Sequence, residues 1–157
     1  MSPREFLNNI VRPNVGDFHI HFADLRHAFN AIAGVDALAA HIYVWALTNT
    51  PTTVTSVSDD SHYRQTLAMR DQNFAWLRDM AKAQKHVRLT RNPPPIANAN
   101  QVTARPIGYG VGPYGAGRFG GVEQVVVDIV PGNFLYVEGI VDDALAFLEA
   151  EMAALGV

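Results

Sequence analysis

The segment FAWLRDMAKAQKHVRLTR, residues 74–91, contains side chains suited to chemistry on a phosphate group. On a helix, Arg78, Lys82 and Lys85 share one face, because residues four and seven positions apart are neighbours. Asp79 and His86 share the adjacent face with Lys82 between them. A carboxylate that orients and charges a histidine beside a row of cations predicts acid–base chemistry on a phosphodiester, with Arg78, Asp79, Lys82 and His86 as the catalytic set. The alternative is an exposed helix face stabilised by ion pairs within the helix.

A second candidate is a metal site in the stretch DFHIHF, where Asp17, His19 and His21 alternate. In an extended segment alternate side chains project to the same side, so these three could bind one transition metal, with His27 or His41 completing the site. The alternative for His41 is a hydrogen-bonded core histidine, because it lies in the apolar phase of a helical pattern. The sequence contains no HExxH helix, EF-hand loop or GxSxG elbow. We predict no other cofactor.

The third candidate is the glycine-rich stretch RPIGYGVGPYGAGRFGG, residues 105–121. Its glycine spacing matches a nucleotide-binding loop, but such a loop needs a strand before it and a helix after it, and the flanking sequence predicts neither. Aromatic residues recur every five positions within it, beside two arginines. Such aromatics pin a loop against an apolar surface, stack on bases, or form a subunit contact. The predicted nucleic-acid or partner contacts are Arg105, Tyr109, Tyr114, Arg118 and Phe119.

The run LRDMAKAQKH, together with DLRHAFNAIAGVDALAAHIY upstream, resembles a group of small uncharacterised bacterial proteins that carry an Arg-Asp pair and a Lys-His pair on a helix. The resemblance covers residues 3–91 and implies no function. More distantly, the run is similar to the HEPN ribonucleases, whose motif is an arginine, a polar residue and a histidine four to six residues further along. Arg78 and Asp79 match its first two elements, whereas seven residues separate Arg78 from His86. The resemblance implies a metal-independent ribonuclease that acts as a dimer, with Arg78 and His86 of both chains at the scissile phosphate.

The elements that must position these residues are mainly helices. Apolar side chains at three- and four-residue steps predict a helix over residues 24–48, either broken at Gly34, with Asp36 as a second N-cap, or continuous and kinked. A first helix is expected over residues 3–11 and should end before Pro13. Three further helices are expected: one that begins after an N-cap at residues 58–60, one over residues 74–91, and a last one that begins after a cap at Asp142 or Asp143. The runs VEQVVVDIV and FLYVE predict two strands joined by a turn. The expected fold is α+β, mainly α: a helical bundle with a β-hairpin inserted before the C-terminal helix.

Length and charge limit the classes of protein that fit. With 157 residues and 48% hydrophobic content, we expect one domain, made of a helical part (1–91), a Pro/Gly-rich loop (92–121) and a hairpin with a final helix (122–157). The net charge is −3, yet the charged residues of 72–122 are all basic except Asp79, and residues 123–157 contain no lysine or arginine. The basic segment is therefore expected to contact either an anionic ligand or the acidic segment of the same domain. The absence of cysteine excludes disulfides, thiolate catalysis and Cys-ligated metals.

The leading functional hypothesis is a small bacterial interaction or assembly protein, phage- or defence-associated, whose glycine–aromatic loop makes a self or partner contact. The alternatives are the ribonuclease or phosphodiesterase described above and a histidine-based metal-binding protein. We expect a cytoplasmic protein with no membrane partner, because the sequence shows neither a continuous apolar run of spanning length nor a signal peptide. A homo-oligomer is expected, with a protein or RNA as further partners, because the chain has more large aromatics than a modest domain hides. These aromatics are Trp45, Trp76, Tyr109, Tyr114 and Phe119.

Overall fold

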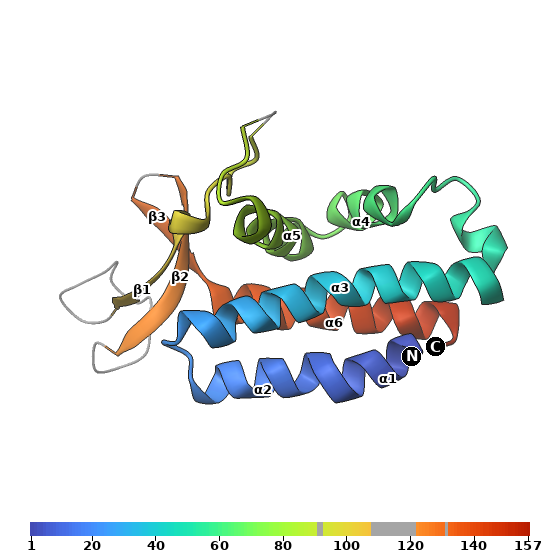
Figure 1. Ribbon diagram of the computed structural model, residues 1–157, viewed down its shortest axis with the longest axis horizontal. Coiled ribbons are helices and arrows are strands. Elements are labelled where there is room, and N and C mark those ends of the chain that lie inside the picture. Colours follow the sequence, from blue (N-terminus) through green and yellow to red (C-terminus); the bar gives the residue numbers. More distant parts are fainter. Residues whose placement is uncertain (91–92, 108–121, 131) are drawn as a thin grey trace.

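The apolar stripe over residues 24–48 folds as one uninterrupted helix, α3 (Leu25–Asn49), which is capped by the Asp24 carboxylate at the backbone N–H of Arg26. Of the two alternatives at Gly34, the structure therefore shows the single helix. The structure is a computed structural model and describes residues 1–90, 93–107, 122–130 and 132–157. Helix α3 lies at the centre of the molecule, between the N-terminal helices on one side and α4 and α5 on the other (Figure 1).

The N-terminal helix does not stop before Pro13, so that prediction is wrong. Helix α1 (Pro3–Phe6) runs through a π-helical stretch, Leu7–Val11, into α2 (Arg12–Ile20). The π-helical stretch shifts the bonding so that the Arg12 N–H reaches the carbonyl of Leu7, and Pro13 falls in the first turn of α2, where a missing N–H is tolerated. The continuation places DFHIHF at the end of a helix. The extended segment expected there is therefore also wrong.

Two shorter helices form a layer over α3. Helix α4 (Asp60–Ala68) begins at Asp59, whose carboxylate accepts from the His62 N–H, as the sequence predicts. Helix α5 (Gln72–His86) is capped in the same way by Asp71 and ends five residues earlier than the predicted helix over 74–91. The chain leaves α5 at Val87, which has φ 61. Positive φ disfavours a β-branched residue, so this turn is a strained position held by its surroundings.

The sheet has one strand more than the hairpin that the sequence predicts. Strand β1 (Val102–Pro106) pairs antiparallel with β2 (Glu123–Val130), and β2 pairs antiparallel with β3 (Asn133–Tyr136), giving the order β1-β2-β3. The last helix, α6 (Val137–Leu155), follows β3 directly, so neither Asp142 nor Asp143 caps it. The first turns of α6 contain Val137, Ile140 and Val141, which are buried in the core. The helix therefore begins directly at the sheet. The predicted class, mainly helical α+β with a hairpin before the C-terminal helix, is confirmed.

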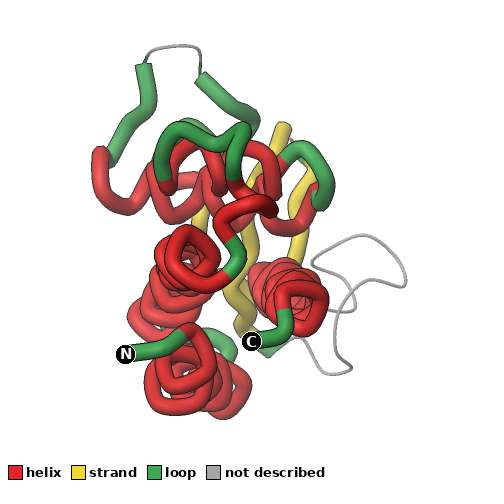
Figure 2. The backbone as a smooth tube through the Cα atoms, turned by 90° about the vertical axis from the view of Figure 1, so that its right-hand side faces the viewer, coloured by secondary structure: helices red, strands yellow, loops and turns green. Residues whose placement is uncertain are grey.

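The elements enclose one hydrophobic core, which draws residues from every helix and from the sheet. Viewed along the helices, α3 and α6 lie side by side between the N-terminal helices and the α4–α5 layer, with the sheet at one end (Figure 2). By length and composition α3 could cross a membrane, with a mean hydropathy of 1.4 in its most apolar window, but 56% of that window is buried in this structure. The larger part of its apolar surface is therefore covered by neighbouring elements.

Candidate functional site

A cleft of about 370 Å³ lies between α4 and α5, under the chain segment that follows α5. Three of the four predicted catalytic residues, Arg78, Asp79 and Lys82, line it together because they project from the α5 face that meets α4. The other lining residues are Gln65, Ala68, Ala75, Leu89 and Pro94. The cleft thus combines two cations and a carboxylate on one wall with small and apolar side chains around them.

Arg78 forms the floor of this cleft and is only 5% exposed. Its guanidinium donates one hydrogen bond to the carbonyl of Ser61, at 2.9 Å, and another to the side-chain oxygen of Gln65. Its Nε is buried without a partner among the described residues. Burial lowers the pKa of Arg78, and the nearby carboxylate of Asp36 opposes that shift. The alternative prediction for this segment, an exposed helix face, is therefore wrong at Arg78.

Asp79 and Lys82 are half-buried at the wall of the cleft. Neither side chain forms a hydrogen bond or an ion pair within the parts of the chain that the structure describes. Burial raises the pKa of Asp79, although Lys82 and Arg78 act against it, and burial followed by repulsion from Arg78 lowers the pKa of Lys82. Titratable groups that are desolvated in a cleft without a fixed partner are typical of ligand-binding and catalytic sites.

The raised pKa of Asp79 has a consequence for stability. A carboxyl whose pKa is raised by folding destabilises the folded state once it ionises, so its stabilising effect is lost as the pH rises through the folded pKa. We expect Asp79→Asn to unfold at a higher temperature than wild type near pH 7 and to match it below 3.8, the ordinary pKa of aspartate. Thermal unfolding across this pH range measures the difference. The exposed Asp17→Asn variant is the control for loss of a negative charge; an equal gain in both variants would contradict the prediction.

A buried ion pair supports the cleft from below. Asp36 on α3 is 3% exposed, and one of its carboxylate oxygens accepts from Arg64 Nη1 at 2.8 Å. Arg64 also bonds Asp60 one turn earlier on α4, at 2.6 Å. The other oxygen of Asp36 has no partner among the described residues. The sequence pattern suggests Asp36 only as a helix cap, whereas its position inside an apolar stripe is the signal that could have identified a buried charge.

His86 lies apart from the other three predicted catalytic residues. It is exposed at the last residue of α5 and does not line the cleft. Lys85 and His86 both occupy the last turn of α5, where cations are favoured by the helix dipole whatever their other roles. The structure therefore brings together Arg78, Asp79 and Lys82 but not the predicted pair of Asp79 and His86.

Most of the basic residues that the structure describes fall into two groups by their partners. Five arginines pair with carboxylates: Arg12 with Glu149, Arg26 with Asp24, Arg64 with Asp36 and Asp60, Arg70 with Glu151, and Arg105 with Asp128. In contrast, Arg78, Lys82, Lys85 and Arg88 form no ion pair with any described residue. The acidic C-terminal segment thus neutralises Arg12, Arg70 and Arg105, and it leaves the cations of α5 unpaired.

The proposed metal ligands do not converge. Asp17 and His19 lie on α2, where His19 Nε2 bonds Asp142 of α6 at 2.8 Å, and the His21 ring stacks on His27 with 4.5 Å between centroids. Because the segment is helical, alternate residues point to different sides. Within the described ranges no three histidine or carboxylate groups are placed to hold a metal ion.

Most of the predicted glycine–aromatic contact lies outside the described residues, namely Tyr109, Tyr114, Arg118 and Phe119. Its role in assembly therefore stays a prediction. Arg105, which the structure describes, is held on the sheet by Asp128 at 2.6 Å and lies over the ring of Phe134, 4.8 Å from its centroid. Trp45 and Trp76, which supported the expectation of an oligomer, pack against the core.

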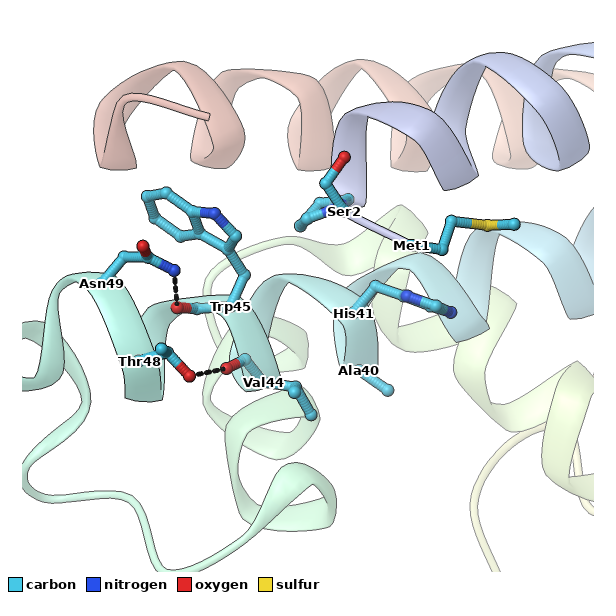
Figure 3. Close-up of a pocket in the computed structure, with 9 residues that line it drawn as sticks. Met1, Ser2, Ala40, His41, Val44, Trp45, Thr48 and Asn49 are labelled. Atoms are coloured by element: carbon cyan, nitrogen blue, oxygen red, sulfur yellow. Dashed lines mark hydrogen bonds between the residues drawn. The ribbon is translucent and has the colours of Figure 1, made fainter.

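A second cavity, of about 430 Å³, lies between the N-terminus and α3 (Figure 3). Its lining is largely apolar, including Met1, Val44 and Trp45. The hydroxyl of Thr48 and the amide nitrogen of Asn49 donate to carbonyls of their own helix, at 3.4 and 2.9 Å. His41 stacks on Phe6, 4.0 Å between centroids, and burial lowers its pKa. Apart from His41, no charged or titratable side chain lines this cavity.

Comparison of the chain with models of protein families, with curated proteins and with solved structures finds no match.

Proposed function

We propose that the protein binds single-stranded RNA along the basic face of α5, with the α4–α5 cleft as the end of the binding surface. The observation that carries this proposal is the set of four cations between residues 78 and 88 that have no carboxylate partner among the described residues. A row of like charges that no ion pair neutralises repels itself, and a polyanion relieves that repulsion while releasing its own counterions.

The arrangement favours a linear polyanion over a compact one. Arg78, Lys82 and Lys85 recur at helical steps along one face of α5, and Arg88 follows just beyond its end. Lys85 and Arg88 are exposed, so their side chains can reach phosphates without any rearrangement of the core. The single strand is favoured over a duplex because Arg78, Lys82 and Lys85 lie on one helix face rather than across a wide surface, and the first two of them line the cleft.

Binding of labelled single-stranded RNA across a salt series tests the proposal directly. With three to four phosphate contacts, we expect the logarithm of the association constant to fall with the logarithm of salt concentration with a slope of about −2 to −3. The protein is used metal-free, and the RNA is inspected afterwards for cleavage. Absence of binding at low salt would overturn the proposal.

The same experiment separates binding from ribonuclease activity. Cleavage lost in both Asp79→Asn and His86→Ala would support the acid–base set predicted from the sequence. Cleavage lost only in Asp79→Asn would place the chemistry in the cleft alone. Binding without cleavage would support a binding protein.

A further inference from the structure

The four cations between residues 78 and 88 differ in how deeply they are buried. Lys85 and Arg88 are exposed, Lys82 is half-buried, and Arg78 at the floor is 5% exposed. An anion that reaches Arg78 must therefore enter the cleft rather than lie across its mouth. The volume of about 370 Å³ admits a small group and is at the lower end of the range for ligand pockets.

Arg78 retains hydrogen-bonding capacity at this depth. A guanidinium has five N–H donors, and the described residues accept from two of its nitrogens, through Ser61 and Gln65. The third nitrogen, Nε, is buried without a partner among the described residues. Beside it, the Lys82 ammonium and the Asp79 carboxyl also lack hydrogen-bond partners within the described ranges. A ligand with several acceptor oxygens in the cleft would accept from the Lys82 ammonium and from the second N–H of each terminal nitrogen of Arg78, whereas the buried Nε is out of its reach.

We propose that the α4–α5 cleft binds the terminal phosphate of a single-stranded RNA, with Arg78 and Lys82 as its cationic contacts. This inference rests on the proposed function and specifies which part of the RNA binds in the cleft. A phosphate within the chain carries a nucleoside on each side, and these bulky groups keep it at the mouth of the cleft. A terminal phosphate has one ester link, up to two negative charges near neutral pH and three acceptor oxygens, so it can enter end-on.

The Asp79 carboxyl fits the same ligand. Because burial raises the pKa of Asp79, its protonated form is more accessible than that of an exposed aspartate. A protonated carboxyl donates to a phosphate oxygen, whereas the ionised form repels it.

The test compares one oligonucleotide sequence in three forms: with a 5′-phosphate, with a 3′-phosphate, and with hydroxyl groups at both ends. We expect one phosphorylated form to bind at least about tenfold more tightly than the hydroxyl form, since a hydrogen bond to a charged group contributes about 1.5–3 kcal/mol. The end that gains affinity identifies the polarity of the bound strand. Fluorescence anisotropy with an internal label measures all three.

Two variants locate the effect. Lys82→Gln should remove the preference for the phosphorylated form, and Arg78→Gln should do the same if thermal unfolding shows that it remains folded. Lys85→Gln is the matched control: it should weaken all three forms equally and keep the preference, because Lys85 lies outside the cleft. Equal binding of the three oligonucleotides would overturn this inference and leave the proposed function intact. No binding of any of them would overturn both.

Discussion

A variant in which Lys82, Lys85 and Arg88 are all changed to alanine is expected to lose most of its affinity for single-stranded RNA. Each cation in contact with a phosphate contributes about 1 kcal/mol in water, so the three together correspond to a loss on the order of 100-fold. The salt slope should become shallower by about 2, because each phosphate contact on a single strand contributes about 0.7. Binding titrations of both proteins across the same salt series measure the two effects.

The matched control changes net charge by the same amount elsewhere. Arg4, Arg12 and Arg26 are exposed and lie on other helices; Arg12 and Arg26 pair with Glu149 and Asp24, and Arg4 bonds the carbonyl of Val157. Their replacement by alanine should leave RNA affinity largely unchanged, because such surface contacts contribute little to stability and do not face the cleft. If both triple variants lose affinity equally, the RNA responds to net charge alone and the basic face of α5 is not its site.

The second large effect is expected from Asp36→Ala. This substitution leaves Arg64 without its buried partner, and breaking a buried pair from one side costs about 3–5 kcal/mol in free energy of unfolding. The cost is high because the Asp36 side chain is 5% exposed and that of Arg64 is 20% exposed, so water replaces the lost carboxylate poorly. Urea unfolding of wild type and variant measures the difference.

Asp60→Ala is the control for this prediction, since it removes the other carboxylate that binds the same arginine. The Asp60 side chain is 43% exposed, and its pair with Arg64 lies within one helix turn, so we expect a loss below about 1 kcal/mol. Equal losses in the two variants would show that burial does not distinguish the two contacts. Recovery of stability in Asp36→Ala combined with Arg64→Met would confirm that the cost arises from an arginine that has lost its buried carboxylate.

The amino-acid sequence by itself determined the class of the fold and most of the helices. Apolar residues at three- and four-residue steps are enough to predict α3, and the carboxylates of Asp59 and Asp24 begin their helices through contacts within one turn. The row of cations on α5 was also visible, because helical spacing alone places Arg78, Lys82 and Lys85 on one face. These features depend on residues close together in the chain.

The tertiary structure alone decided which of these cations are buried and which of them have an ion-pair partner. Helix α4 covers Arg78 and supplies Ser61 and Gln65 as its partners, while the end of α5 leaves His86 in solvent. Ion pairs between distant segments assign the acidic C-terminal helix to arginines other than those of α5. Burial and pairing of a charge depend on the element that packs over it. Contacts between residues far apart in the chain therefore decide which cations have an ion-pair partner, which local spacing cannot do.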